Sequence, residues 1–473
     1  MRKLGLFVSA ALSLVLVLVT FMAVPMVSMQ NATPVPAPTL TSVPLVAQQA
    51  GEVEVTFWYG LGGLLGNVVI ETVNMYNDSQ DVYYVNPVFQ SSYDDTINRI
   101  NAGLASGELP DLAQVFEAGS QRMIDTGRII PVQTFFDRDG LQSVIDDMEP
   151  AVRANYTING ILQSAPFNSS TAMLFIDRAA FVAAGLNPDQ TLNTFDEIKE
   201  YARALTVRDA SGNVTRHGIG LYPEGWFFEQ IHAAHEVPMG TPDNGITGRM
   251  EQYTYNDSIG VEWLEFMKSM VDEGTAIYFG TGGGNAANAA FTNGETSMTF
   301  SSIAGLRTLI AGAERAGVGV EVGTVFMPRR PDTAGKTIVG GASLWITDAG
   351  STEAQEGAWD FIKWALTPEV QAFWASNTGY YPVVQASYET EIMQAALVAY
   401  PQFQVAIDQI RLSEIAFANT AHISGTFVSM RQDVITAIDG YLTGAIPTAQ
   451  EALDIAVATS NELLTEYNST VSN

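Results

Sequence analysis

Strand-like and helix-like segments alternate between residues 52 and 117, and this alternation constrains the fold more than any other feature of the chain. Residues 52–60, EVEVTFWYG, alternate apolar and polar as a half-buried strand does. The next segment places Val69, Val73 and Tyr76 on one stripe at helical spacing. Strand and helix in this order predict βαβ units and a parallel sheet. Strands are expected at 52–60, 81–90 and 111–117, and helices at 64–80 and 92–110.

The pattern changes across residues 163–177, QSAPFNSSTAMLFID, after which helices dominate. Strand, helix and strand return near residue 296, and helices then continue to the end of the chain. This interleaved order predicts two α/β lobes, each discontinuous in sequence, joined by short crossing segments. A cleft between two such lobes is a usual place for a small ligand. The lobes are expected at 51–165 plus 303–342 and at 166–302 plus 343–473.

The first thirty residues form a targeting segment. Arg2 and Lys3 precede an apolar run, residues 4–27, that is longer than an ordinary signal-peptide core and long enough to span a bilayer. The segment is therefore either a signal peptide or an uncleaved N-terminal anchor. In both cases the chain is exported, to the periplasm or the cell surface. Residues 31–50 are rich in Pro, Thr and Ala without a period, which predicts an extended tether.

Charge and cysteine content exclude several classes of function. The formal net charge is −29, from 51 acidic and 22 basic residues. Nucleic acids and anionic membranes need a basic surface, so neither is expected as a partner. The chain has no cysteine, which excludes disulfides, thiol catalysis and Cys-ligated metals. The composition is that of an ordered globular protein, and we expect a monomer.

No catalytic or metal-binding motif stands out. The chain lacks a G-x-S-x-G elbow and an H-E-x-x-H sequence, so we expect neither an enzyme nor a cofactor or metal site. His232 and His235 are spaced to share a helix face, but the sequence indicates no third ligand beyond Glu229 or Glu236, which favours ordinary surface histidines. The glycine-rich stretch 280–285 lacks the Lys-Ser/Thr of a phosphate loop and favours a flexible loop before a helix.

Residues 163–171, QSAPFNSST, place polar side chains between strand-like segments. Asn168 begins an N-x-S glycosylation pattern, a serine could act as a nucleophile, the hydroxyls could bind a ligand, or the residues could form a polar turn. A glycan would block a closing cleft, and no general base lies at a recognisable spacing. We therefore expect this stretch to cross between the lobes, with Asn168 and Ser169 fixing a turn.

Three further positions offer groups that suit an anion. Ser302 lies where a strand gives way to a helix, whose free N–H groups attract an anion, although N-capping by Ser301 or Ser302 is the simpler explanation. Gly340 and Gly341 either let the backbone approach a ligand closely or make a bulge. Arg431 lies on an apolar helix, where it either packs its stem with the head in solvent or clamps an anion.

Taken in this order, the pieces resemble the extracellular solute-binding proteins of ABC importers, and most of all the members that bind glycerol 3-phosphate. The resemblance covers most of the chain after residue 50. It is carried by FWYGLGGLLG, SSYDDTINRINAGLASGELPDLAQVFEAGS, QSAPFNSSTAMLFIDRAAFVAAGLNPDQ, FTNGETSMTFSS, IVGGASLWI and NTGYYPV. The resemblance implies an α/β, two-lobed periplasmic-binding-protein fold of type II, which closes on its ligand about hinge segments.

The resemblance also implies which residues bind the ligand. Tyr93 and Glu117 would hydrogen-bond the glycerol hydroxyls, and Trp226 would line the cleft. Since a carboxylate repels a phosphate, Glu117 is expected at the far end of the ligand, over the polyol. The implied protein partners are the transmembrane subunits of an ABC permease. The phosphate would be held by a set of donors: Ser170, Ser302, Gly341, Tyr380 and Arg431.

The chain departs from the family at two positions. Phe195 stands where the family has a tryptophan at a helix start, and Tyr222 replaces one of two cleft tryptophans. A roomier cleft would admit a glycerophosphodiester such as glycerophosphocholine, whose cationic head group would face an aromatic wall. Two alternatives stay open. One is an oligosaccharide-binding protein, and the other is a secreted hydrolase of glycerophosphodiesters, for which the sequence offers no metal or nucleophile constellation.

Overall fold

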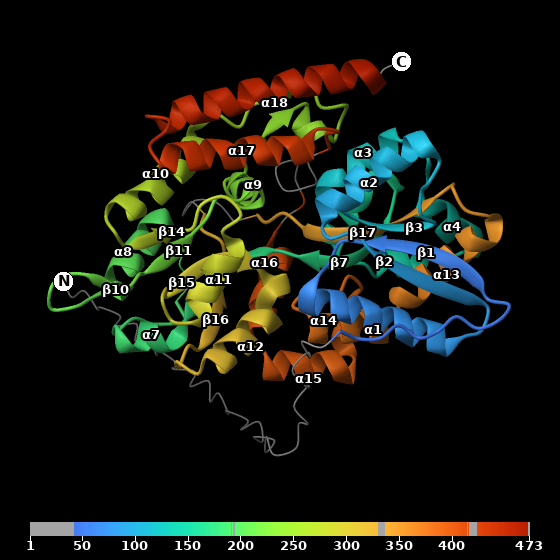
Figure 1. Cartoon of the computed structure of the whole chain (residues 1–473), viewed down its shortest axis with the longest axis horizontal. Helices are drawn as coiled ribbons and strands as arrows, with labels where there is room; N and C mark the ends of the chain where they lie inside the picture. The colour runs from blue at the N-terminus through green and yellow to red at the C-terminus, as the bar shows by residue number, and fades with distance from the viewer. Residues whose placement is uncertain are drawn as a thin grey trace, which may run out of the picture. The chain divides into compact units, whose positions relative to one another are not determined.

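The computed structural model describes residues 42–190, 192, 194–329, 336–413, 415 and 423–471. These residues form two lobes, each built on a mixed β-sheet flanked by helices (Figure 1). The first lobe is the sheet that contains β1 (Val53–Tyr59) with its helices, and the second lobe is the sheet that contains β8 (Ala172–Asp177) with its helices. The expected α/β, two-lobed fold is confirmed.

Six strands form the sheet of the first lobe. They are β1, β2 (Tyr83–Phe89), β3 (Leu112–Phe116), β4 (Ile129–Ile130), β7 (Ala165–Ser170) and β17 (Gly340–Thr347). The order is β2-β1-β3-β17-β4, with β7 also paired to β17. β1 pairs in parallel with β2 and β3, as the βαβ pattern predicts. β17 arrives from much later in the chain and runs antiparallel to β3, β4 and β7.

Side chains alternate across this sheet and so define two apolar layers. The helices around it are α1 (Gly63–Ser79), α2 (Tyr93–Ser106), α3 (Ser120–Asp125), α13 (Thr352–Ala365) and α14 (Pro368–Asn377). Phe57 of β1 packs on Phe361 of α13, with ring centroids 6.0 Å apart. The next residue, Trp58, faces α2, where the guanidinium of Arg99 lies 5.1 Å from its ring. The period of two expected from the sequence therefore separates the layers.

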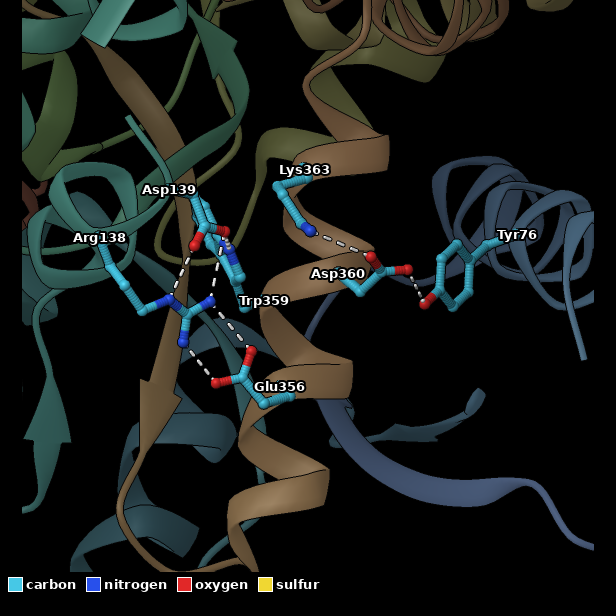
Figure 2. A network of polar contacts seen from close by, with 7 residues as sticks. All are labelled: Tyr76, Arg138, Asp139, Glu356, Trp359, Asp360 and Lys363. Carbon is cyan, nitrogen blue, oxygen red and sulfur yellow. Dashed lines mark hydrogen bonds and ion pairs between the residues drawn. The ribbon is translucent and has the colours of Figure 1, made fainter. Parts of the chain in front are cut away.

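Polar links tie α13 to two other helices of the first lobe (Figure 2). Trp359 donates from Nε1 to Asp139 at the end of α4 (Val132–Asp139), at 2.7 Å. Arg138 forms an ion pair with the same carboxylate, with Nε 2.7 Å from Oδ1. On the other side of α13, the hydroxyl of Tyr76 in α1 donates to Asp360 at 2.9 Å. These bonds fix the helix that covers β1 and β17.

Short elements complete the connection from α4 to β7 in the first lobe. They are α5 (Gln142–Asp146), α6 (Pro150–Tyr156), β5 (Thr157–Ile158) and β6 (Ile161–Leu162). After α14 the chain forms α15 (Glu391–Ala399) and α16 (Gln402–Leu412). α15 packs against α14 and α16, and α16 packs against the second sheet.

Five strands form the sheet of the second lobe, in the order β14-β11-β15-β8-β16. Their bounds are β8, β11 (Ile219–Leu221), β14 (Ala276–Tyr278), β15 (Met298–Ser302) and β16 (Val322–Val325). β11 pairs in parallel with β14 and β15, whereas β8 runs antiparallel to β15 and β16. Every residue of β8 is buried, because helices cover both faces of this strand.

Helices of the second lobe come from two distant parts of the chain. They are α7 (Arg178–Ala183), α8 (Phe195–Leu205), α9 (Gly225–Ala234), α10 (Ser258–Asp272), α11 (Gly284–Thr292), α12 (Leu306–Ala316), α17 (Phe427–Leu442) and α18 (Ala449–Val471). α17 packs along α18 and against α9 and α10 (Figure 1). Two small hairpins lie at the periphery: β9 (Val207–Arg208) with β10 (Val214–Arg216), and β12 (Gly240–Thr241) with β13 (Gln252–Tyr253).

The stretch QSAPFNSST crosses between the lobes, as expected. Ser170 ends β7 in the first sheet, and β8 of the second sheet begins two residues later. The residue between them, Thr171, is fully buried and its hydroxyl lies 2.6 Å from that of Thr337. Gln409 donates to the same hydroxyl at 2.8 Å. Asn168 and Ser169 do not fix a turn, because both lie within β7.

Sheet membership differs from the predicted lobe boundaries at three strands. β16 was expected in the first lobe but pairs with β8 in the second sheet. Most of β17, and the last residues of β7, were expected in the second lobe but belong to the first sheet. The sequence pattern locates a strand from its local periodicity, whereas the partner of a strand depends on contacts far away in the chain.

The end of the predicted tether is part of the first lobe. The backbone N–H of Val46 donates to Asn74 of α1 at 2.9 Å, and the carbonyl of Val46 accepts from the Tyr84 hydroxyl at 2.9 Å. Residues 42–50 therefore lie along α1 and β2 instead of forming a free linker. The predicted targeting segment and residues 31–41 lie outside the described residues. Within the described ranges, no helix is long and apolar enough to cross a membrane.

Candidate ligand-binding site

The pairing of β7 with β17 brings two predicted site residues together. Gly341 is paired with Ser169, and Gly340 with Ser170, before the register shifts between Ala342 and Ser343. Gly341 has a φ of +104°, and a Cβ built there would lie 1.9 Å from the carbonyl oxygen of Asn168. A side chain at position 341 is therefore excluded. The register shift comes after the two glycines, and its extra residue is Phe167 of β7, so Gly340 and Gly341 do not themselves form the bulge.

A chain of polar side chains runs from β3 to Tyr380 through the first lobe. Gln114 donates to the Asn168 side chain at 2.9 Å, and Asn168 in turn donates to the Tyr93 hydroxyl at 2.8 Å. The hydroxyls of Tyr93 and Tyr380 lie 3.4 Å apart. Burial raises the pKa of Tyr93 well above its usual value, so both phenols are neutral donors or acceptors. Asn168 is fully buried, which leaves no room for a glycan.

Arg431 enters the site from the first turns of α17 and is held by two carboxylates. Its Nε donates to Glu229 at 2.5 Å, and its Nη2 donates to Glu229 at 2.9 Å and to Glu117 at 2.5 Å. The guanidinium also lies 5.6 Å from the ring of Phe116 and 5.1 Å from that of Phe427. The side chain is 12% exposed. These contacts fix the plane of the guanidinium before any ligand arrives.

The contact between Arg431 and Glu117 joins the two lobes. Glu117 begins the short 3-10 turn Glu117–Gly119 after β3 in the first lobe, and Arg431 belongs to α17 in the second. Glu117, expected over the polyol, is thus in direct contact with Arg431, expected at the phosphate. The place of each along a ligand stays a prediction.

The remaining nitrogen of Arg431, Nη1, is not used by Glu117 or Glu229. Among the described residues, no hydrogen bond involves Nη1 of Arg431. Because the other polar N–H groups face Glu117 and Glu229, an incoming anion can take the Nη1 donors without displacing either carboxylate.

Several carboxyl groups surround the guanidinium of Arg431, and burial raises the pKa of three of them. Burial raises the pKa of Glu229 to about 7, and Arg431 only partly offsets that rise. Burial also raises the pKa of Glu224 and that of Asp94, and Arg431 offsets only part of each rise. The site around Arg431 is therefore acidic in sum, apart from the guanidinium itself.

Trp226 lies against Gly340, the neighbour of the predicted site residue Gly341. A Cβ built on Gly340 would lie 2.3 Å from the indole ring, so the absence of a side chain at position 340 makes space for the tryptophan. Trp226 is half-buried in the first turn of α9. Its Nε1 is buried and has no hydrogen-bond partner among the described residues. The same turn contacts Arg431: a Cβ built on Gly225 would lie 2.8 Å from the Cβ of Arg431.

A cavity of about 500 Å³ opens beside Trp226 in the second lobe. Such a volume suits a small-molecule ligand. Tyr222, Glu224 and Ser302 contribute to its wall, together with the start of α11. The glycine-rich stretch 280–285, expected to be a flexible loop before a helix, thus forms part of this wall. Ser302 also caps the 3-10 turn that follows β15, since its hydroxyl accepts from the N–H of Ala304 at 3.2 Å.

The structure brings the eight predicted residues to one region. Tyr93 contacts Tyr380, Glu117 contacts Arg431, Ser170 pairs with Gly340 next to Gly341, and Trp226 shares a cavity with Ser302. The carbonyl of Ser170 accepts from the Tyr381 hydroxyl at 3.2 Å, which ties the turn that carries Tyr380 to β7. Their roles toward a ligand remain predictions.

Sequence reasoning did not place Glu229 or Glu224 in the ligand-binding site. Both lie in the stretch YPEGWFFEQI, where an acid inside an otherwise apolar run is a signal of a buried, paired charge. Glu229 has a side chain that is 1% exposed and holds Arg431, 202 positions away. The sequence shows that such an acid needs a partner, but it does not identify the partner.

The two departures from the family have different positions. Tyr222 lines the cavity beside Trp226. Phe195 instead packs within the second lobe, with its ring centroid 4.6 Å from that of Phe266 and 5.6 Å from that of His235. Of the two substitutions, only the one at Tyr222 changes the wall of this cavity.

The paired histidines are buried, contrary to the surface position expected for them. His232 is fully buried and His235 is 5% exposed, and the Nδ1 of each lies within hydrogen-bond distance of a backbone carbonyl one turn earlier in α9. Across the ranges that the structure describes, no group of three His, Cys, Asp or Glu residues could hold a metal ion.

Comparison with known proteins assigns the family. The model of the bacterial extracellular solute-binding proteins matches residues 71–403. The sn-glycerol-3-phosphate-binding periplasmic protein UgpB of Yersinia enterocolitica is 31% identical over 422 residues, 88% of this chain and 93% of that protein. UgpB of Salmonella typhimurium is 29% identical over 433 residues, 90% of this chain and 96% of that protein.

Solved structures confirm the fold. UgpB of Mycobacterium tuberculosis in complex with glycerophosphocholine superposes with a TM-score of 0.73 at 19% identity, over 88% of this chain and all of that one. The GacH receptor of Streptomyces glaucescens, solved unliganded and with acarbose, gives a TM-score of 0.71 at 17% identity, over 88% and 99% of the two chains. The export expected from the sequence agrees with this family. The chain belongs to the bacterial extracellular solute-binding proteins.

Proposed function

We propose that the protein is the substrate-binding component of an ABC importer, which captures sn-glycerol 3-phosphate or a glycerophosphodiester and delivers it to the permease. The observation that carries the proposal is the state of Arg431. Glu117 and Glu229 hold this guanidinium in one orientation, and its Nη1 donates to no described residue. A fixed, partly shielded guanidinium edge is suited to a phosphate oxygen. The names of the Yersinia and Salmonella relatives support the same ligand class.

The groups around Arg431 suit the two parts of such a ligand. Ser170, Ser302, the backbone of Gly341 and the Tyr380 hydroxyl supply further donors for the phosphate. Tyr93 and the second oxygen of Glu117 accept or donate to hydroxyls of the glycerol part. Trp226 covers the cleft from the second lobe.

Closure of the lobes would couple binding to transport. The ligand would contact Glu117 and Tyr93 in the first lobe and Arg431 and Ser302 in the second, so it stabilises the closed form over the open one. The permease would recognise that closed form. The protein acts as a monomer and as a carrier, without catalysis; failure to turn over a chromogenic phosphodiester is the result we expect.

A second candidate is an oligosaccharide-binding protein. The cavity beside Trp226 is lined by amides, hydroxyls and aromatic rings, which also suit sugar hydroxyls and ring faces. Under this alternative, Arg431 and its two carboxylates would be purely structural.

Calorimetric titration of wild type and Arg431→Lys with sn-glycerol 3-phosphate separates the two candidates. Lysine keeps the charge beside Glu117 and Glu229 but loses the planar fork, so phosphate binding should weaken by roughly tenfold or more. Arg128→Lys is the matched control, because Arg128 pairs with Asp348 at the surface. Thermal unfolding checks that each variant is folded. Unchanged phosphate affinity in Arg431→Lys, or sugar binding without phosphate binding in wild type, would contradict the proposal.

A further inference from the structure

A line of buried amides leads from the residue after β1 to the Tyr93 hydroxyl. The backbone N–H of Gly60 donates to Oε1 of Gln114 at 3.1 Å. Nε2 of Gln114 donates to Oδ1 of Asn168 at 2.9 Å, and Nδ2 of Asn168 donates to the hydroxyl oxygen of Tyr93 at 2.8 Å. Gln114 and Asn168 are both fully buried. Of the four residues in this line, only Tyr93 is among the eight predicted to bind the ligand.

The backbone N–H at one end fixes the direction of every hydrogen bond in this line. A backbone N–H can only donate, so Gln114 must turn its amide oxygen toward Gly60 and its NH₂ group toward Asn168. Asn168 must in turn present its oxygen to Gln114 and its NH₂ group to Tyr93. Reversal of either amide would set donor against donor or oxygen against oxygen, at the cost of leaving buried polar groups unpaired.

This direction decides where the proton of the Tyr93 hydroxyl points. A phenol has one proton, and the side of its oxygen that faces Asn168 already accepts an N–H. The proton of Tyr93 therefore points away from Asn168. Its only acceptor among the described residues is the Tyr380 hydroxyl, whose oxygen lies 3.4 Å away. A hydrogen bond between two hydroxyls is usually about 2.7–2.8 Å long, so a closer acceptor on a ligand can take this proton.

The contact between the two tyrosines leaves one phenol proton without an acceptor. The pair has two hydroxyl protons, and the contact between Tyr93 and Tyr380 uses one of them. Asn168 uses neither, because it acts as a donor to both phenols: burial raises the pKa of Tyr380, and hydrogen bonds from Tyr93 and Asn168 offset part of that rise. One hydroxyl proton of the pair thus meets no acceptor among the described residues.

The ring that carries the Tyr93 hydroxyl is also fixed in place. It stacks on Phe116, with ring centroids 5.4 Å apart and an angle of 8° between the planes. The backbone at the start of α2 lies against β1, since a Cβ built on Gly60 would lie 2.7 Å from the backbone nitrogen of Tyr93. With the ring held, the remaining freedom is the rotation of the hydroxyl proton, and the line of amides removes it.

We infer that Gln114 and Asn168 are positioning residues, which hold the Tyr93 hydroxyl as a hydrogen-bond donor toward the ligand. The inference rests on the proposed function and deepens it, because it states which kind of ligand atom Tyr93 can meet. That atom is an acceptor: a phosphate oxygen, or a glycerol hydroxyl that gives its own proton to the carboxylate of Glu117. Gln114 acts on the ligand only through Asn168 and Tyr93.

Gln114→Glu tests the direction of the line, because a carboxyl group keeps the shape of the amide but changes its hydrogen bonding with pH. The protonated carboxyl group accepts from Gly60 and donates to Asn168, as the glutamine does. The ionised carboxylate can only accept, so the Asn168 amide turns round and its oxygen draws the Tyr93 proton inward. Because position 114 is fully buried, the pKa of the new carboxyl group should lie above its usual range.

Calorimetric titration with sn-glycerol 3-phosphate between about pH 5 and pH 9 measures the effect. The quantity compared is the ratio of the affinity of Gln114→Glu to that of wild type at each pH, because Glu229 and the phosphate titrate with both proteins. The ratio should be close to one at the acid end and fall by roughly tenfold at the alkaline end, the usual effect of one hydrogen bond to a charged group. Thermal unfolding at each pH checks that both proteins are folded.

Two controls separate the direction of the Tyr93 hydroxyl from the charge of the new carboxylate. Tyr93→Phe has no proton to redirect, so in that background the fall with pH should be much smaller, whereas repulsion between carboxylate and phosphate would give the same fall in both backgrounds. Gln371→Glu is the matched control, because Gln371 is a fully buried glutamine of α14 outside the line. It accepts from the N–H of Val383 at 3.1 Å and donates to the carbonyl of Ala365 at 2.8 Å, and its affinity ratio should not change with pH.

The outcomes separate this inference from the function on which it rests. With wild type binding the probe, the inference is overturned by a constant ratio in folded Gln114→Glu, by an equal fall in the Tyr93→Phe background, or by Tyr93→Phe binding as tightly as wild type. Each of these results leaves the proposed function standing. If Gln114→Glu unfolds at the alkaline end, Asn168→Asp makes the same reversal directly beside Tyr93 and is judged by the same comparisons. If folded wild type does not bind the probe, the proposed function fails, and the inference with it.

Discussion

Single residues in the site act mainly by fixing Arg431. The guanidinium of Arg431 donates three hydrogen bonds to the carboxylates of Glu117 and Glu229. The aliphatic part of the side chain lies against Gly225. An arginine without these partners would lose several rotamers on binding a ligand, at a cost in conformational entropy. Glu229 is therefore a positioning residue, and its own burial is the energetic cost of that role.

That cost should appear as a dependence of stability on pH. Burial raises the pKa of Glu229 to about 7 from a usual value of 4.5, so between these values the folded protein holds a proton that the unfolded chain has released. The contribution of Glu229 to stability is therefore fully present below pH 4.5 and is lost as the pH rises through 7. From pH 5.5 to pH 8 the loss should be about 2 kcal/mol.

Chemical denaturation of wild type and Glu229→Gln at several pH values measures this contribution. Other groups titrate in both proteins, so the quantity of interest is the difference between the two profiles. The wild-type free energy of unfolding should fall relative to that of the variant as the pH rises. Parallel profiles would show that the buried carboxylate does not take up a proton on folding.

At the scale of elements, β17 organises the site. Its first residues pair with β7, its middle with β3 and its end with β4, so the strand connects the hinge to the centre of the first sheet. Gly340 and Gly341, which pair with Ser170 and Ser169, give the start of this strand two positions without side chains.

Gly341→Ala should therefore destabilise the protein strongly. The φ of +104° is unfavourable for alanine, and its Cβ would overlap the carbonyl oxygen of Asn168 at 1.9 Å. We expect a loss of at least about 3 kcal/mol in the free energy of unfolding. Gly185→Ala is the control, because Gly185 has a φ of +75° but open space around it, and it should cost about 1 kcal/mol. Similar losses in the two variants would mean that the backbone around position 341 shifts to accept a side chain.

Elements were predictable where the signal is local. The first three strands and two helices follow from alternating and helical periodicity. The sheet that receives β16 or β17 could not be predicted in the same way, because β17 pairs with β3 from a segment more than 200 residues earlier. For the same reason Arg431 was assigned from the family resemblance, whereas its partner Glu229 was not identified at all.

At the scale of the whole molecule, a second set of contacts joins the lobes away from Arg431. Asp125 of α3 accepts from Arg249 of the second lobe at 3.0 and 2.8 Å, and from the Tyr467 hydroxyl of α18 at 2.8 Å. Arg122 of α3 donates to the carbonyl of Gly425 at 3.2 Å. The Asp125 side chain is 7% exposed, so this pair is better shielded than an ordinary surface ion pair.

Asp125→Asn should shift the protein toward the open form. Loss of the charge weakens a contact that exists only while the lobes meet, so the population able to hold the ligand falls and apparent affinity falls with it, by roughly fivefold. Small-angle scattering without ligand should show a larger radius of gyration. Asp348→Asn breaks the exposed pair with Arg128 inside the first lobe and should change neither quantity. An unchanged radius and affinity in Asp125→Asn would remove this contact from the closing equilibrium.

The contact between Trp226 and Gly340 makes two distant positions depend on each other in evolution. Any side chain at position 340 would place its first carbon 2.3 Å from the indole ring, so it is harmful while the tryptophan is present. After Trp226 has been replaced by a smaller residue, the same substitution becomes tolerable. The order of mutations is thereby constrained: relatives that adapt this cleft to bulkier ligands should lose the tryptophan first and gain a side chain on β17 only afterwards.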